Sequence, residues 1–483
     1  MKNIFLLLLT TAVCVLSGCG KSPEKKLVVV TNAAFPPYEY VANRKIEGID
    51  PHIIHKIAAR LGYAVEIQDM SFDSVIAAVQ SGKADIAASG ITVTEERKKQ
   101  VAFSLPYVVA EQVIIVPKTS KIAAGRDLKG KRIGVQHGTT GDMYVSKHIC
   151  EPQRYKDSAV AVAALLSGKL DAIVVDTEPA EVYVRQRTSL KRLHEPLTFE
   201  EYAFAFNRKN KELLSKFNAE REKMLKSGEV AQIIKMYKEA HSRSAGNVVV
   251  DADGFWNRMK QSFALNFLTA QRYYYLLDGF FITLQVTVFA IVIGLVIGFA
   301  VAVIRNMSEQ TGRFKWLDFL CRLYLTVIRG TPVVVQLLII YFVIFSSVDI
   351  DKVFVAIIAF GVNSGAYVAE IVRGGIASID KGQMEAARSL GFGYWQSMRF
   401  VILPQAIKAV LPSLGNEFIV LLKETSVSGY IALQDLTKGG DIIRSQTYDA
   451  FFPLLAVALV YLIVVMVLGK LLAVFEKRLK RNE

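Results

Sequence analysis

The pattern of apolar and polar residues changes near the middle of the chain. Residues 21 to 277 mix charged positions with short apolar runs, whereas residues 279 to 475 hold much longer apolar runs. A helix needs about 20 apolar residues to cross a bilayer. The candidate spans are Gly279 to Ile304, Pro332 to Val348, Val353 to Val372, Ile407 to Leu422 and Phe451 to Phe475. We therefore expect a water-exposed half followed by an all-α membrane half of about five helices.

Short β-branched runs alternate with helical stretches in the water-exposed half, which is α/β patterning. The runs read LVVVT, VIIVP, KRIGVQ and DAIVVD. An internal echo accompanies them, because Ser81-Gly82-Lys83 followed by Asp85 matches Ser167-Gly168-Lys169 followed by Asp171. In both places a helix ends at glycine and a strand follows. The echo predicts two similar lobes whose facing strand ends form a cleft.

A polar run from Ile379 to Arg399 interrupts the membrane half. It reads IDKGQMEAARSLGFGYWQSMR and carries charges such as Lys381, Glu385 and Arg388, which lipid does not tolerate. The run therefore lies in water on one side of the bilayer, where a protein partner can reach it.

The first residues resemble an export signal. MKNIFLLLLTTAVCVLSGCG has one lysine, an apolar core and then small residues, and Leu16 to Cys19 resembles a bacterial lipobox. We expect residues 1–18 to be a signal peptide, Cys19 to carry a lipid and residues 19–26 to form a linker; a plain signal or an uncleaved anchor is the alternative. With Cys19 lipidated, Cys150 is the only free cysteine of the exported part, so no disulfide is expected.

Charge in the loops orients the membrane half. The net charge of +14 could indicate a nucleic-acid partner. However, the three segments of the membrane half that would face the cytosol hold five, five and four Lys or Arg. The two loops that would face outward hold only one and three. This is the positive-inside bias, so no nucleic acid is expected. The cytosolic segments are Arg305 to Thr331, Arg373 to Lys408 and the tail from Glu476; residues 476–483 form that tail. The polar run at 379 to 399 is accordingly cytosolic.

Residues 27–240 resemble the periplasmic binding proteins for polar amino acids. The resemblance rests on TNAAFPPYEY, SFDSVI, SGITVTEER, GKRIGVQHGTTGD and VVDTEP. It implies a two-lobed α/β fold of type II, with lobe 1 at about 27–113 and 207–240 and lobe 2 at about 114–206. The ligand-binding residues that it implies are Asn32, Phe35, Phe72, Ser89, Gly90, Thr92, Arg97, Gln136, Thr140 and Asp176.

The chemistry of these residues suits an amino-acid zwitterion. Arg97 would bind the carboxylate with help from Thr92, while Asp176 and Thr140 would hold the ammonium. Phe35 and Phe72 would cover the stem of the ligand. Asn32 and Gln136 are neutral amides placed near the side chain of the ligand, so a glutamine-like ligand is favoured over a basic amino acid or cystine. A cation would require a carboxylate, which Glu39 could supply.

The membrane half resembles the permeases of amino-acid ABC importers. The matching segments are DGFFITLQVT, RGTPVVVQL, AYVAEIVRGGIASIDKGQMEAARSLG, LPQAIKAVLPSLGNEFI and LLKETSVSGYIALQDL. They cover nearly all of residues 278–475, after a linker and interfacial segment at 241–277. The resemblance assigns Glu385, Ala386, Ala387 and Gly391 to coupling with an ATPase. Glu417, Asn363 and Gln336 lie in spans as costly polar groups and are candidates for the substrate path; hydrogen bonds between helices are the alternative.

No ATP site of its own is expected in this chain. Gly125 to Arg132 nearly spells a phosphate-binding loop, but Arg132 stands where Ser or Thr is required, and the segment precedes a strand instead of opening a helix. ATP and Mg would thus bind a separate ATP-binding cassette ATPase subunit, and five spans suggest that two copies pair as a homodimer. An amino-acid-gated channel and a membrane sensor are rivals; an enzyme is not expected, since no nucleophile set or metal cluster is evident.

Overall fold

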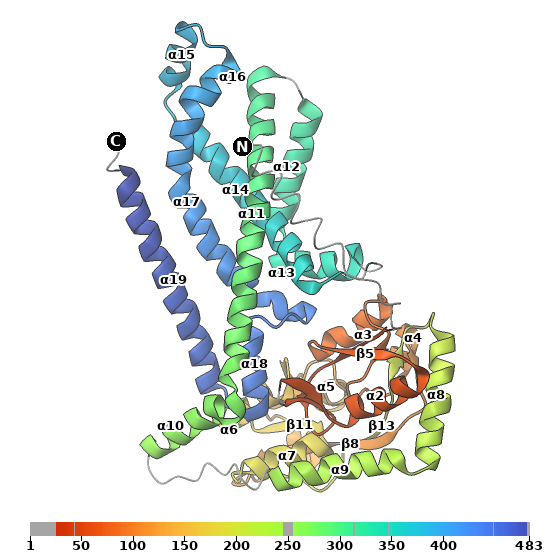
Figure 1. Ribbon diagram of the computed structural model, residues 1–483. Coiled ribbons are helices and arrows are strands. Elements are labelled where there is room, and N and C mark those ends of the chain that lie inside the picture. The colour runs from red at the N-terminus through yellow and green to blue at the C-terminus, as the bar shows by residue number, and fades with distance from the viewer. Residues whose placement is uncertain are drawn as a thin grey trace.

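The computed structural model describes residues 26–480, apart from 43, 245–254, 313, 346–347, 349 and 448. The expected signal peptide and Cys19 lie outside the described residues. A two-lobed α/β domain is followed by long helices, and in Figure 1 the domain lies at the lower right, beside the lower ends of these helices.

Lobe 1 is built on a five-stranded sheet of order β5-β1-β6-β14-β7. Its strands are β5 (Ala64–Asp69), β1 (Lys26–Thr31), β6 (Ile86–Ala87), β14 (Ala205–Phe206) and β7 (Ala102–Phe103). A small sheet adds β2 (Ala34–Phe35), β3 (Glu39–Ala42) and β4 (Lys45–Glu47). The helices are α2 (Ile49–Leu61), α3 (Phe72–Gln80), α4 (Glu95–Gln100), α8 (Lys211–Lys226) and α9 (Glu229–Ser244). The apolar faces of α2, α8 and α9 bury residues such as Ile53, Phe217 and Ile233 against β1 and β6, which stabilises the lobe by removing apolar surface from water.

Lobe 2 repeats this plan with a sheet of order β10-β9-β11-β8-β12, in which β13 also pairs with β8. The strands are β10 (Gln153–Tyr155), β9 (Ile133–Gln136), β11 (Ala172–Asp176), β8 (Val108–Pro117), β12 (Leu190–Arg192) and β13 (Thr198–Tyr202). The helices are α5 (Thr140–His148), α6 (Ser158–Leu166) and α7 (Thr177–Gln186). The chain thus crosses into lobe 2 at β8 and returns at β14, a few residues before the boundaries expected from the sequence.

The echo in the sequence is an echo in the structure. Gly82 and Gly168 have φ of 80° and 73°, the left-handed conformation that ends a helix. Asp85 then accepts a hydrogen bond from the Val28 amide at 2.9 Å, and Asp171 accepts one from the Arg132 amide at 2.9 Å. Each aspartate joins the start of its strand to the neighbouring parallel strand, β1 or β9.

The membrane half contains four helices long and apolar enough to span a bilayer, or up to five if a bent pair counts as one, among the described residues. These helices are α11 (Tyr273–Thr311), α14 (Lys352–Ala377), α17 (Leu403–Glu424) and α19 (Phe451–Lys480), and the bent pair is α12 (Lys315–Gly330) with α13 (Val333–Ile339) and a π-turn at Ile340–Ile344. The predicted fold class, a two-lobed α/β domain followed by about five membrane helices, is confirmed.

The second predicted span, Pro332 to Val348, differs from the structure. Helix α13 and its π-turn have 7 and 5 residues, too short together to cross a bilayer, and they meet α12 at 111°. The break falls at Thr331, which is extended with φ −123° and ψ 146° because proline follows it. Helix α12, which falls in the segment Arg305 to Thr331 expected in the cytosol, is therefore the first arm of the bent pair.

Helices α11 and α14 pack closely along small residues. Gly294 and Gly298 on α11 face Ser364 and Val368 on α14, and Gly361 on α14 faces Ile293 on α11. A Cβ at Gly361 would lie 2.8 Å from the Ile293 side chain. In a membrane, close packing of this kind holds helices together because burial of apolar surface no longer does.

The sequence did not predict helix α18 (Leu436–Thr447), which was expected to be part of an outside loop. Its polar composition hides it, yet it packs against α11 through Gly439, where a Cβ would lie 2.3 Å from the Tyr275 carbonyl oxygen. In Figure 1, α18 lies beside the lower end of α11 and next to the α/β domain.

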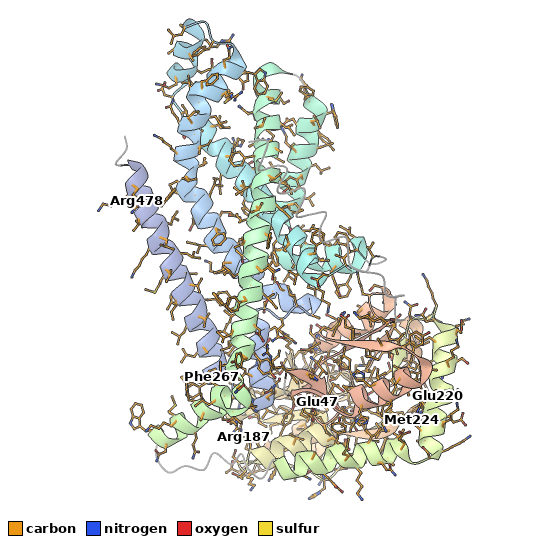
Figure 2. All side chains as sticks on the ribbon, in the orientation of Figure 1. Glu47, Arg187, Glu220, Met224, Phe267 and Arg478 are labelled. Carbon is orange, nitrogen blue, oxygen red and sulfur yellow. The ribbon has the colours of Figure 1, made fainter. Side chains whose placement is uncertain are left out.

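Both lobes of the α/β domain contact α18 through ion pairs. Lys438 pairs with Asp69 of lobe 1 at 2.6 Å, whereas Asp441 pairs with Lys156 of lobe 2 at 2.9 Å. Arg444, one turn further along, lies 3.5 Å from Asp157 of lobe 2. Spacings of three residues place all three α18 side chains on one helix face, so a single face of the helix spans the two lobes. Arg187 of lobe 2, labelled near α18 in Figure 2, also donates to the Thr447 carbonyl at 3.1 Å.

Candidate functional site

One cavity between the two lobes collects all ten ligand-binding residues expected from the sequence. The space between its lining atoms amounts to ≈ 320 Å³, open solvent included. Its lining comprises Asn32, Phe35, Glu39, Phe72, Ser89, Gly90, Thr92, Arg97, Gln136, Thr139, Thr140 and Asp176. Polar groups from both lobes converge on a space bounded by two aromatic rings.

Arg97 is buried in this cavity. It lies on α4, whose start is capped by the Thr94 hydroxyl, and only 7% of it is exposed. Its guanidinium donates to the Thr92 carbonyl at 2.7 Å and, across the cleft, to the Gly138 carbonyl at 3.0 Å. A guanidinium has five N–H donors, so three are left for a ligand carboxylate. Burial lowers the pKa of Arg97, while the nearby Glu200 raises it.

Asp176 is the acidic counterpart on lobe 2. It ends β11 and precedes α7, but its side chain makes no capping hydrogen bond. Instead it accepts a hydrogen bond from the Tyr202 hydroxyl. Burial raises the pKa of Asp176 to about 7, reinforced by the charge of Glu200. A ligand ammonium beside it would favour the ionised form.

Two phenylalanines bound the cavity. The ring of Phe72 lies against the Arg97 guanidinium, 5.5 Å from ring centre to Cζ. Phe35 lies against Gly90, which has φ 48°, and a Cβ at Gly90 would come within 2.9 Å of the Phe35 ring. Only glycine fits there, which lets the backbone of this loop reach the ligand space.

The amides of Asn32 and Gln136 bond to each other across the cleft. Gln136 Nε2 donates to Asn32 Oδ1 at 3.1 Å, and Asn32 Nδ2 donates to the Met70 carbonyl at 3.0 Å. Together with the Arg97 bond to Gly138, this contact holds the two lobes in a closed arrangement. The amide pairing also occupies groups expected to contact the ligand side chain.

Glu200 on β13 is a site residue that the sequence reasoning missed. Its Oε2 accepts hydrogen bonds from the hydroxyls of Thr92 in lobe 1 and Thr140 in lobe 2, both at 2.6 Å. It thus joins the lobes through the two hydroxyls expected to meet the ligand. Alternation along TFEEY, which buries Glu200 and Tyr202 together, was the available signal.

The three polar residues expected in the membrane path make hydrogen bonds within the helix bundle. Glu417 on α17 accepts from the Ser364 hydroxyl on α14 at 2.8 Å, and Asn363 donates to Glu424 at 3.1 Å. Gln336 donates to the Ile328 and Thr331 carbonyls at 2.7 and 3.0 Å, which ties α13 to α12 across the bend. These geometries are those of the alternative, in which polar groups join helices; the substrate path stays a prediction.

The polar run at 379 to 399 forms a small helical unit at the end of the bundle opposite the α/β domain (Figure 1). Helix α15 (Lys381–Ser389) is capped by Asp380 and ends before Gly391, whose φ of 88° turns the chain toward α16 (Tyr394–Ser397). Ala387 is buried, whereas Glu385, Ala386 and Gly391 are exposed. Leu390 is 79% exposed, and an apolar side chain in that position is suited to a partner.

Two family matches divide the chain. Residues 27–240 match the bacterial extracellular solute-binding proteins, family 3, and residues 290–481 match the inner membrane component of binding-protein-dependent transport systems.

Individual relatives match one half or the other. A putative glutamine transport system permease protein of Rickettsia bellii is 41% identical over 207 residues, which is 42% of this chain and 93% of the relative. The arginine transport system permease protein of Bacillus subtilis is 37% identical over 212 residues, 43% of this chain and 94% of the relative. The crystal structure of a mutant of ArgBP from T. maritima is 38% identical, with a TM-score of 0.43, over 44% of this chain and 94% of that chain.

The described residues contain no group of three or more His, Cys, Asp or Glu arranged to hold a metal ion.

The two matched regions are joined in one polypeptide, in the order binding domain then membrane component. The chain therefore belongs to the amino-acid ABC importer permeases, as a fusion of a solute-binding domain with a multi-pass permease domain.

Proposed function

We propose that this chain captures a polar L-amino acid outside the cell and passes it inward through its own permease domain, driven by a separate ATP-binding cassette ATPase. The observation that carries the proposal is the opposition of Arg97 and Asp176 across one closed cleft. One supplies fork-shaped donors for a carboxylate and the other a buried acid for an ammonium. An α-amino acid bears both groups on one carbon, so it can bridge the lobes.

The substrate class within this proposal includes glutamine-like and basic amino acids. The neutral amides Asn32 and Gln136 led to the expectation of a neutral side chain, and relatives named for glutamine and for arginine both match the permease domain. The cavity also contains Glu39, which suits a cation.

Coupling to the ATPase is assigned to α15 and the turn after it. Support comes from the exposure of Glu385 and Leu390 at the end of the bundle farthest from the cleft (Figure 1). Arg478, labelled in Figure 2 near the upper end of α19, belongs to the basic tail at the same side of the helices as α15. Basic loops at that side agree with a cytosolic position. ATP and Mg would bind the partner subunit only.

A homodimer completes the proposed pathway. Helix α19 is apolar, yet only 11% of its most apolar window is buried in the described chain. Leu462, Ile463 and Met466 on it are each more than half exposed, which fits contact with lipid or a second copy. An exported binding domain, following a cleaved signal and a lipidated Cys19, would place one tethered domain on each copy and raise its local concentration at the permease.

Uptake by reconstituted protein tests this function. Proteoliposomes that hold the chain and a partner ATPase would take up labelled amino acid only with ATP enclosed on the ATPase side. Uptake that continues at the same rate without ATP, or without the partner, would contradict the proposal.

A further inference from the structure

Glu39 is a buried carboxylate in the cleft that binding of an amino-acid backbone leaves unused. It begins β3, is fully buried and lines the cavity. Ser89 donates a hydrogen bond to its Oε1 at 3.1 Å. Its Oε2 is buried and receives no donor from the described residues. Buried carboxylate oxygens without a donor are costly, which points to a proton or a ligand at this atom.

Asp50 forms an acid pair with Glu39. It lies at the start of α2, where it accepts hydrogen bonds from the Gly90 amide at 3.0 Å and from the Tyr107 hydroxyl. The charge of Asp50 acts directly on Glu39. The acid pair therefore backs the Ser89–Gly90 loop that forms part of the cavity wall.

No cation faces the acid pair among the described residues that interact with it electrostatically. Those residues are Tyr38, Asp69, Ser89, Tyr107 and Asp176. Burial raises the pKa of Glu39 well above its ordinary value, helped by the charge of Asp50, and burial raises the pKa of Asp50 to about 7. Two adjacent buried carboxylates share a proton when nothing compensates their charge.

When an amino acid is bound, Glu39 is the charged side chain of the cavity lining that has no opposite charge from the ligand backbone. Among the lining residues, the charged side chains are Glu39, Arg97 and Asp176. The carboxylate and ammonium of an amino acid balance Arg97 and Asp176. A ligand whose side chain is neutral adds nothing opposite Glu39, whereas a side chain of charge +1 balances an ionised Glu39.

We propose that Glu39, backed by Asp50, is the specificity-determining residue of the cleft, that it selects a basic amino acid, and that the cationic side chain displaces the shared proton to solvent. The inference rests on the proposed function, because it uses the same cleft. The side-chain amides of Asn32 and Gln136 hydrogen-bond to each other, so Glu39 is the group that selects the side chain of the ligand. Since a proton leaves as the cation enters, affinity for a basic ligand strengthens as pH rises, by up to about tenfold per pH unit while one full proton is released.

Calorimetric titration of the full chain in lipid nanodiscs tests this inference. Arginine is compared with citrulline, its neutral isostere, from pH 5 to 8 and in buffers of different ionisation enthalpy. The expected result is that arginine binding strengthens more steeply with pH and releases more protons than citrulline binding, which is weak and releases a proton only from Asp176. Equal affinity and equal pH dependence for the two ligands would overturn the selection by Glu39.

The variant Glu39→Gln separates the role of the carboxylate from that of the cleft. We expect it to weaken arginine binding by at least about tenfold and to reduce proton release to the amount that citrulline causes, while citrulline or glutamine still binds. Glu95→Gln, an exposed acid on α4, is the matched control and is expected to behave as wild type. Arginine binding unchanged in Glu39→Gln would refute the inference.

If Glu39→Gln does not fold, the difference in proton release between arginine and citrulline with wild type decides alone: a larger release with arginine supports the acid pair, and an equal release refutes it. A wild type that binds citrulline or glutamine but no basic amino acid refutes the inference and spares the proposed function. A wild type that binds no amino acid at all contradicts the proposed function itself.

Discussion

Lys438 of the membrane half lies 2.6 Å from Asp69 of the binding domain, and both side chains are largely buried. Asp69 ends β5, and its Oδ1 accepts a hydrogen bond from the Ala33 amide at 2.9 Å. Ala33 follows Asn32 in the cleft wall. The ion pair therefore connects a permease helix to the strand end that builds the ligand site.

Reversing the charge of Lys438 is expected to undock the binding domain. In Lys438→Glu two buried acids face each other, and breaking a buried pair costs roughly 3–5 kcal/mol. Uptake should fall at least about tenfold while ligand affinity is unchanged, measured by transport and calorimetry on one preparation. Lys226→Glu, on an exposed part of α8, is the control; equal uptake by both variants would show that the pair is dispensable.

Replacing Arg97 is expected to abolish capture of the amino acid. Lysine at this position loses the forked donor set that reaches Thr92, Gly138 and a carboxylate together. We expect Arg97→Lys to raise the Kd by about 100-fold or more in calorimetry. Arg126→Lys, outside the cavity lining, should leave it unchanged. Near-wild-type binding by Arg97→Lys would remove Arg97 from the carboxylate site.

In the ligand-free chain, ionisation of the buried Asp176 should lower the stability of the folded state as pH rises. Its pKa is raised to about 7 by burial, whereas an unfolded aspartate titrates near 3.9. The folded state thus binds more protons between about pH 4 and 7, and the stability from this group is complete below pH 4 and is lost as pH rises through 7.

Asp176→Asn removes this cost. Its Tm should exceed that of wild type at pH 8 and approach it at pH 5, in thermal unfolding of the empty full chain. A difference in Tm that is the same at both pH values would contradict the burial of an ionisable Asp176.

The close packing of α11 and α14 predicts a position-specific effect of one methyl group. A Cβ at Gly365 would lie 2.9 Å from the Tyr324 hydroxyl and 3.0 Å from the Ile297 side chain, while a Cβ at Gly374 would meet nothing within 4 Å. Gly365→Ala should destabilise the membrane half by about 1–3 kcal/mol. Gly374→Ala on the same helix is the control, and equal melting of the two variants in detergent would rule out the close contact.

The exposed face of α15 predicts a separation of binding from transport. Glu385→Lys and Leu390→Asp alter a surface at the end of the bundle away from the cleft, so ligand affinity should stay as in wild type. Uptake in the presence of the ATPase should be lost. Variants that lose ligand binding, or that keep full uptake, would show that this surface does not couple to the ATPase.

The cleft could be predicted from sequence because its residues sit in locally recognisable segments. All ten expected residues line one cavity, and most of them lie at or just after a strand end or at the start of a helix. Glu200 was missed because its partners, Thr92 and Thr140, are 108 and 60 positions away. No local pattern reveals a contact over such separations.

The membrane half was harder to predict from the sequence at places where polar residues pack inside it. Hydropathy located α11, α14, α17 and α19 but not α18, whose lysine and arginine are buried and whose aspartate is half-buried against the binding domain. The bend at Pro332 divides one apolar run between two helix directions. Both features depend on partners that are distant in the sequence.

ATP hydrolysis by the reconstituted complex with and without ligand tests most directly whether the cleft and α15 are two ends of one importer. A partner ATPase is combined with wild type, Arg97→Lys or Glu385→Lys in the same lipid. We predict that ligand stimulates hydrolysis with wild type only, because one variant fails to capture the amino acid and the other fails to pass the signal on. Equal stimulation of hydrolysis by ligand in all three proteins would contradict a link between the cleft and the ATPase.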